Sequence, residues 1–245
     1  MIKFRQASAG FVLIEVALAM IIFSLCLGGI LTVLTYSKKA QQQTTTQTHY
    51  TVVSSALNRY YRTHGHLPCP SSPAMGDGFA LERCQGALQQ IGLVPHKTLG
   101  IPASFIKDGQ GYYFTYAVSE RSTITDSTLR ETTTTNPLIV IDADDTPYRT
   151  GVKGIAYILI SHGQKGSGAF SNQSARRRLP TESAFEAENA RDTLTFYGDA
   201  PANKSEHSVF FVLHDDLTAP PTSLSQTTIG DDDAENAPYG LLESD

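Results

Sequence analysis

Residues 11–36 read FVLIEVALAMIIFSLCLGGILTVLTY, and this apolar run, in which only Glu15 is charged, decides how the chain is interpreted. As an α-helix it would be about 39 Å long, which exceeds the roughly 30 Å hydrocarbon core of a bilayer. Lys3 and Arg5 precede it, and a short basic flank predicts that the chain start stays on the cytoplasmic side. The run therefore predicts a membrane-spanning helix, with the rest of the chain exported.

The small residues before this run distinguish it from an ordinary secretory signal peptide, whose cleavage site follows the apolar core. Here the small residues 7–10, Ala-Ser-Ala-Gly, come first, so cleavage after Gly10 would leave the helix on the mature chain. Glu15 is unusual because an acid in a membrane span is costly unless it is neutralised. It lies near the headgroups, or is protonated, or pairs with a new amino terminus at Phe11 of a neighbouring subunit.

Residues 10–15, GFVLIE, resemble the processing site of type IV prepilins, which is found in pilins and in type II secretion pseudopilins. The resemblance implies that a prepilin peptidase cleaves after Gly10 and methylates the amino group of Phe11. It also implies that Glu15 is the glutamate used in assembly. The chain departs from many members of the family at Thr32, where they carry a helix-breaking proline.

The chain turns polar after Tyr36 but carries no helix breaker before Gly65. Apolar and aromatic residues recur there at spacings of three and four, a pattern that predicts an amphipathic helix continuing to residue 63. The stripe consists of Tyr36, Ala40, Gln43, Gln47, Tyr50, Val53, Leu57 and Tyr60, and it is strongest from Val52 onward.

Five apolar runs beyond the helix are rich in β-branched and aromatic residues and are bounded by turn residues, which predicts strands. They are residues 111–118, 138–141, 155–161, 194–198 and 209–213. No helix-length periodic segment separates them, which favours an antiparallel sheet over a βαβ layout. The predicted fold is therefore α+β: a long N-terminal α-helix, membrane-spanning in its first half, packed on an antiparallel β-sheet head as in pilins.

The predicted parts of the chain follow from these patterns. They are a leader peptide (1–10), a transmembrane and assembly half of the helix (11–36), a periplasmic amphipathic half (37–63), a globular β-rich head (64–217) and an acidic tail (218–245).

Segments of the head also resemble a group of prepilin-type proteins. The matching segments are HLPCP (66–70) with Cys84, LGIP (99–102), ISHGQKGSGA (160–169), EN (188–189) and HDDL (214–217).

Cys69 and Cys84 lie in a Pro- and Gly-rich stretch after the helix. In an exported domain they are well placed for a disulfide, which would stabilise the fold by roughly 3 kcal/mol. His64 and His66 could join them in a zinc site, but this spacing is not a recognised ligand frame, so the disulfide is favoured.

Asp215 and Asp216 are candidate calcium ligands by resemblance to type II secretion major pseudopilins, in which a glycine-rich loop and a later Asp-Ile element bind calcium. The corresponding loop here, residues 163–168, carries Lys165 where that family places an acid, which would weaken such a site. The alternative is that the two aspartates cap backbone amides of the loop.

Ser161 and His162, with Asp215 or Asp216, also suggest a hydrolytic triad. Adjacent residues in an extended strand point to opposite faces, however, and the chain has no nucleophile elbow of the Gly-x-Ser-x-Gly type. A glycine-rich turn after a strand accounts for the motif better, and no catalytic residue is predicted.

The charge distribution argues against a nucleic-acid partner, because the net charge is -5 and such binding needs a basic face. The three arginines at 176–178 are predicted to form a solvated loop, with binding of DNA as the alternative. No Lys or Arg follows Lys204, and the acidic tail is predicted to be solvated surface.

The resemblance to prepilins, together with these patterns, implies a non-enzymatic structural subunit, a minor pilin or pseudopilin, of a type IV pilus-like or type II secretion filament. Its partners would be prepilin peptidase, other pilin or pseudopilin subunits, the inner-membrane assembly platform and, before assembly, membrane lipid. It would lie in the inner membrane as a single-pass protein with a periplasmic head, and then in the filament. Two alternatives remain: a membrane-anchored periplasmic adhesin or sensor that never polymerises, and an enzyme domain on a pilin anchor.

Overall fold

The computed structural model describes residues 9–84, 86, 89–125, 137–142, 146–148, 154–171, 176, 183–199 and 207–218, without the side chains of residues 9–13, 26–34, 199 and 218. Residues 1–8 of the predicted leader (1–10) and residues 219–245 of the predicted tail (218–245) lie outside the described residues. The chain forms two compact units, Met1–Thr44 and Thr45–Asp245.

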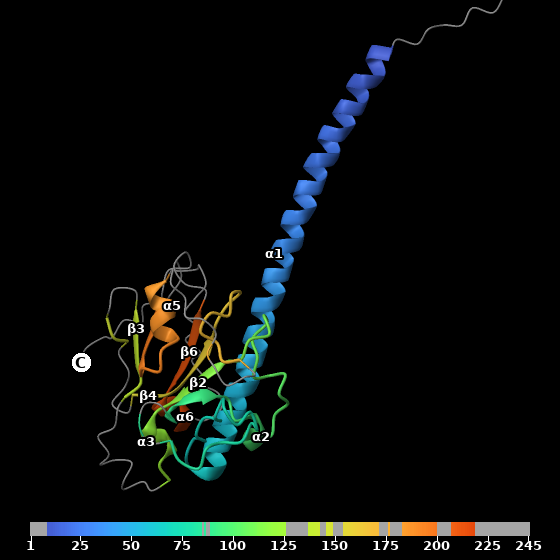
Figure 1. Ribbon diagram of the computed structural model, residues 1–245. Coiled ribbons are helices and arrows are strands. Elements are labelled where there is room, and N and C mark those ends of the chain that lie inside the picture. Colours follow the sequence, from blue (N-terminus) through green and yellow to red (C-terminus); the bar gives the residue numbers. More distant parts are fainter. Residues whose placement is uncertain are drawn as a thin grey trace, which may run out of the picture. The chain divides into compact units, whose positions relative to one another are not determined.

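Helix α1 (Ala9–His64) contributes to both units and contains no proline (Figure 1). It ends at Gly65, whose φ of 74° is a left-handed conformation that glycine adopts without steric cost. The Gly65 amide donates a hydrogen bond of 2.7 Å to the carbonyl of Tyr61 and so closes the last turn.

The prediction that the first half of this helix spans a membrane is wrong. None of the helices in the described part of the chain has both the length and the apolar content that a bilayer crossing requires. The predicted location, a single-pass protein of the inner membrane, is therefore also wrong. The same finding overturns the prediction that residues 11–36 form a transmembrane segment.

The second unit is built around a four-stranded antiparallel sheet with the order β1-β2-β4-β6. Its strands are β1 (Ile91–Leu93), β2 (Thr115–Val118), β4 (Ile155–Ser161) and β6 (Ser208–Leu213). The central strand β4, IAYILIS, is apolar at nearly every position and buried throughout, as expected for a strand covered on both faces.

One face of this sheet packs against the part of α1 that belongs to the second unit. Tyr50, Val53 and Leu57 of the helix share a buried cluster with alternate residues of the strands, including Tyr157 and Phe210. The rings of Tyr50 and Phe210 stack with centroids 4.3 Å apart. Residues three and four apart on the helix therefore pack against residues two apart on the strands.

The opposite face of the sheet packs against a second, smaller sheet (Figure 1). Strands β3 (Ile139–Asp142) and β5 (Thr195–Asp199) pair in parallel, whereas the sequence predicted only antiparallel pairing. Val140 and Phe196 of this pair share a buried cluster with Ile158 and Phe211 of the main sheet. Local strand patterns do not reveal pairing partners, which explains the error.

Short helices complete the second unit. They are α2 (His96–Leu99), α3 (Glu120–Thr123), α5 (Ala184–Asn189) and α6 (His214–Thr218). Helix α5 packs on β5, and α6 follows directly from β6.

Candidate functional site

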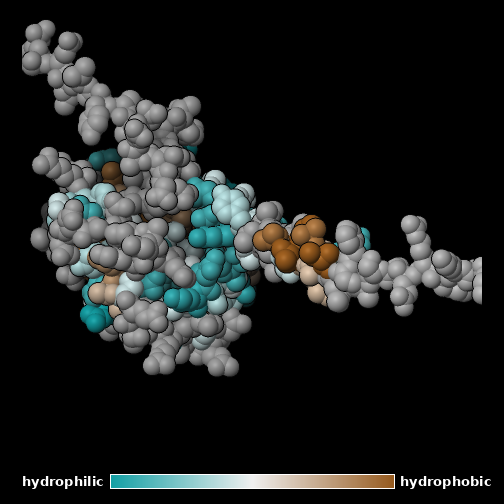
Figure 2. Space-filling model, turned by 90° about the horizontal axis from the view of Figure 1, so that it is seen from above, coloured by the Kyte–Doolittle hydropathy of each residue, from teal (hydrophilic) through white to brown (hydrophobic). Residues whose placement is uncertain are grey.

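The first candidate site is the apolar start of α1. Met20, Ile21, Ile22 and Phe23 are consecutive, and each exposes more than half of its side-chain surface. Successive residues of a helix point about 100° apart, so apolar surface faces solvent on every side of this segment. Figure 2 shows this segment of the helix in brown.

The residues predicted to take part in processing and assembly lie at this end of the helix. Glu15 is exposed there, one turn after Phe11. Gly10 and Phe11 belong to the first turns of α1, and their side chains lie outside the described residues.

The second candidate is a buried polar network around Asp108, in the turn that leads to β2. One carboxylate oxygen of Asp108 accepts hydrogen bonds from the amides of Gln110, at 3.1 Å, and Tyr112, at 2.8 Å. The other accepts a hydrogen bond of 2.8 Å from the hydroxyl of Ser161. Burial raises the pKa of Asp108, and these hydrogen bonds oppose the rise.

His162 follows Ser161 but belongs to a separate set of hydrogen bonds. Its Nε2 lies 2.8 Å from the hydroxyl of Thr115, and its Nδ1 lies 3.1 Å from the carbonyl of Ser167. A carbonyl only accepts, so Nδ1 carries the proton and Nε2 accepts from Thr115 when the ring is neutral. Burial holds the pKa of His162 well below its ordinary value, and the neighbouring His207 and Arg176 lower it further.

The triad hypothesis has no geometric support in this arrangement. Ser161 bonds directly to Asp108, while His162 bonds to Thr115 and Ser167 on the glycine-rich turn. Asp215 and Asp216 lie in the first turn of α6, the first exposed and the second half-buried. The polar network therefore ties a turn and a loop to the end of β4 and contains no serine–histidine pair.

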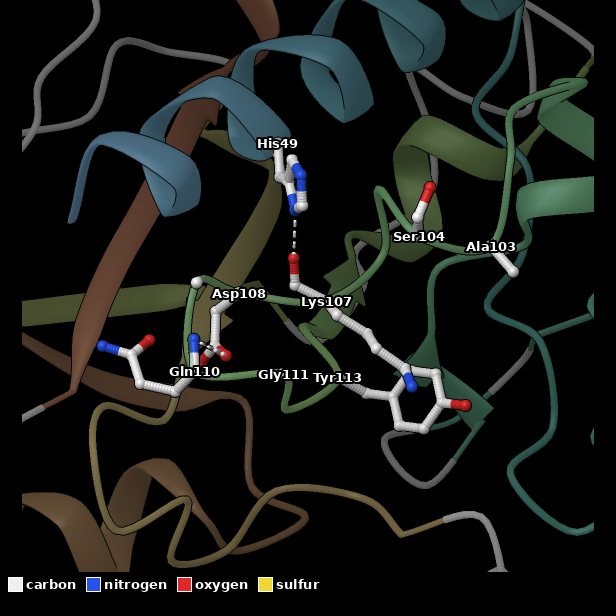
Figure 3. A pocket seen from close by; sticks show the side chains of 9 residues that line it. His49, Ala103, Ser104, Lys107, Asp108, Gln110, Gly111 and Tyr113 are labelled. Carbon is white, nitrogen blue, oxygen red and sulfur yellow. Dashed lines mark hydrogen bonds between the residues drawn. The ribbon is translucent and has the colours of Figure 1, made fainter. Parts of the chain in front are cut away.

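A pocket of about 570 Å³ lies beside Asp108, between α1 and the loop at residues 103–113 (Figure 3). His49 points from α1 toward this loop, and its Nδ1 donates a hydrogen bond of 2.6 Å to the carbonyl of Lys107. The amine of Lys107 lies 4.7 Å from the ring centre of Tyr113. His49 thus joins the loop to the helix, whereas Lys107 contacts a residue of its own loop and Asp108 bonds to its own turn and to Ser161.

Cys69 and Cys84 form a disulfide, with their Cα atoms 5.6 Å apart. This bond removes both thiols from the zinc site that the sequence left as an alternative. In the part of the chain that the structure describes, no group of three or more His, Cys, Asp or Glu residues is placed to hold a metal ion, and this includes the calcium candidates Asp215 and Asp216.

Arg176 is bound to the protein, in contrast to the predicted solvated loop. Its guanidinium forms an ion pair with Asp192 at 2.9 Å, donates to the carbonyl of Gly168 at 2.9 Å, and lies 4.1 Å from the ring centre of Phe170. The local run of three arginines gave no sign of these distant partners. The other two, at 177 and 178, lie outside the described residues.

Sequence reasoning also missed Asp108 and Thr115. The segment DGQG at residues 108–111 carries a turn signal, because an aspartate often bonds to backbone amides two residues on. That signal could have identified Asp108 as a turn residue, but not its bond to Ser161.

Comparisons with protein-family models, with curated proteins and with solved structures found no match.

Proposed function

We propose that this chain is a structural subunit of a type IV pilus-like or type II secretion-type filament, assembled through the apolar start of α1. The observation that carries the proposal is the all-round exposure of large apolar side chains between Ile14 and Leu25. Soluble proteins rarely leave so large an apolar surface uncovered.

The distribution of this surface around the helix favours several partners over one. A single groove would cover one face of a helix and leave the opposite face in water. Neighbouring copies of the same helix, packed around it in a filament core, would cover every face. This favours polymerisation over the adhesin or sensor alternative, in which the segment would have no such partners.

Glu15 fits this proposal as the residue that selects the register of packing. An uncompensated carboxylate among apolar helices is costly, and a cation beside it removes most of that cost. Cleavage after Gly10 would create an amino terminus at Phe11, four residues before Glu15. The terminus of one subunit can then neutralise Glu15 of the next.

Two measurements on assembled material test the proposal. Mass spectrometry of sheared filaments is expected to show a chain that begins at an N-methylated Phe11. Glu15→Ala is expected to remove the subunit from the filaments, whereas Lys38→Ala, an exposed change on the same helix, should leave its level unchanged. An intact leader in filaments, or Glu15→Ala at the wild-type level, would refute the proposal.

A further inference from the structure

The end of α1 carries two histidines whose arrangement is independent of the proposed assembly. Nδ1 of His64 lies 3.0 Å from the carbonyl of Tyr60, and Nδ1 of His66 lies 3.0 Å from the carbonyl of Leu67. Because a carbonyl only accepts, both rings hold their proton on Nδ1. In the neutral rings, each Nε2 therefore presents a lone pair, and neither has a hydrogen-bond partner among the described residues.

This pattern is that of metal-binding histidines, in which one ring nitrogen binds the ion while the other donates to a carbonyl or carboxylate. The backbone bond fixes the tautomer and orients the ring before the ion arrives. Two neighbouring rings with the same tautomer, fixed in the same way, offer two nitrogen ligands of the kind that Zn²⁺, Ni²⁺ and Cu²⁺ prefer.

Gly65 brings the two rings together. His64 belongs to the last turn of the helix and His66 to the following loop, so the two residues are not part of an extended strand. In an extended strand, residues two apart would lie on the same face about 7 Å apart. The left-handed φ of Gly65 turns the chain back, and the ring centroids of His64 and His66 lie 6.2 Å apart.

The separation agrees with shared coordination of one ion. With a metal–nitrogen distance of about 2.1 Å, the centroids of two imidazoles on one ion lie about 5.2 Å apart at a tetrahedral angle and about 6.4 Å apart at a linear one. His64 is exposed, so its side chain can rotate. A decrease of about 1 Å in the distance between the ring centroids gives the tetrahedral arrangement.

The helix dipole and the charged side chains act in opposite directions at this position, because the last turn of α1 also contains Arg62. The last carbonyls of α1 carry the negative end of the helix dipole. The ring of Tyr60 stacks on His64 at 3.9 Å and meets His66 edge-on at 5.8 Å, which restricts both rings. The nearby Arg59 directs its guanidinium to the carbonyl of Leu99, at 3.2 Å.

We propose that His64 and His66 bind one divalent transition-metal ion through their Nε2 atoms, with water in the remaining coordination positions. The site differs from the His–Cys zinc site considered from the sequence, because the Cys69–Cys84 disulfide leaves no thiolate to bind. A pair of histidines with water ligands makes a surface site that exchanges its ion readily.

The test is a titration of the full, oxidised chain with ZnCl₂, followed by calorimetry and by nitrogen NMR of the histidine rings. We expect one equivalent of Zn²⁺ to bind, with the Nε2 signals of His64 and His66 shifting while both Nδ1 atoms stay protonated. Zn²⁺ binding that appears only after reduction of the disulfide would overturn the proposal, because it would assign the ion to the cysteines.

Substitutions distinguish one shared site from two separate ones. His64→Gln and His66→Gln are each expected to weaken Zn²⁺ binding at least tenfold, and the double variant should bind no more weakly than either single one. His96→Gln, which removes a half-buried histidine elsewhere in the unit, should leave the affinity unchanged. Independent, multiplicative losses in the two single variants, or unchanged binding in the double variant, would refute a shared site.

Discussion

Asp108 shows how one buried carboxylate organises a turn. Its two oxygens accept hydrogen bonds from the backbone of the same turn and from Ser161 at the end of β4. Only 3% of the surface of Asp108 is exposed, its bond with Ser161 is buried, and its two backbone bonds are half-buried. Loss of this acceptor leaves the buried hydroxyl of Ser161 and two half-buried amides without their partner, which costs more than the net value of the bonds themselves.

We therefore expect Asp108→Ala to lower the free energy of unfolding by about 2–4 kcal/mol. Ser161→Ala removes one donor and leaves the backbone bonds in place, so a loss of only about 1 kcal/mol is expected. Urea unfolding measures both. Asp77→Ala is the matched control, since Asp77 is half-buried and accepts a backbone hydrogen bond that is itself exposed. Equal losses for Asp108→Ala and Asp77→Ala would contradict the role given to the network.

His162 makes the stability of the second unit depend on pH. Its pKa is held well below the usual 6.5, first by burial. The unfolded chain therefore binds a proton below pH 6.5 that the folded chain does not, so stability is complete above that value and falls as the pH drops. The slope attributable to this residue reaches at most about 1.4 kcal/mol per pH unit.

The measurement is the free energy of unfolding between pH 8 and pH 5.5, compared with that of His162→Gln. We expect the variant to be less stable at pH 8 but to lose less stability on acidification. Asp108, whose pKa is raised by burial, acts in the opposite direction as the pH falls, and it is present in both proteins. Identical slopes in the two proteins would exclude His162 as the source.

Among the elements, the segment between Cys69 and Cys84 depends most on a covalent bond. It contains no helix or strand, and it is attached to the rest of the unit by a few hydrogen bonds, such as that from Lys97 to the carbonyl of Gly78 at 2.9 Å. Both cysteines are nevertheless buried in the core cluster beneath α1. The disulfide restricts the conformation of this segment, as hydrogen bonding within a helix or sheet would do elsewhere.

Reduction of the disulfide is expected to lower the free energy of unfolding by roughly 3 kcal/mol, because the unfolded chain gains loop freedom. Urea unfolding with and without reductant checks this. The double variant Cys69→Ala/Cys84→Ala should lose a similar amount and should not respond to reductant. An unchanged midpoint after reduction would show that the loop is held by its other contacts.

At the scale of the whole molecule, the two units differ in how their apolar residues are covered. Both core clusters consist of residues of the second unit, from Tyr50 onward. The described apolar residues of the first unit are exposed along the helix. The second unit therefore has a core of its own, whereas the described apolar residues of the first unit leave a large apolar surface uncovered, as the proposed assembly would require.

We expect residues 45–245, produced alone, to fold with the urea midpoint of the full chain and to remain monomeric. The full chain should self-associate, and Met20→Lys with Phe23→Lys should reduce this association while leaving the midpoint unchanged. Sedimentation velocity measures the association. If the isolated second unit associates as strongly as the full chain, the apolar start of α1 is not the assembly surface.

The sequence by itself determined the elements whose signal is local. The proline-free stretch before Gly65 predicts a helix, and each of the five apolar runs overlaps a strand, because periodicity and turn residues act over a few positions. The spacing of Cys69 and Cys84 also predicted their disulfide. The short strand β1 lacked such a pattern and was missed.

Tertiary structure alone decided the features that join distant residues. The parallel pairing of β3 with β5, the bond from Ser161 to Asp108 and the ion pair of Arg176 with Asp192 connect residues far apart in the chain. Local patterns carry no information about such partners, because they are set by packing of the whole unit. The apolar composition of residues 11–36 predicts a membrane crossing, but no helix in the described part of the chain has the length and apolar content for one.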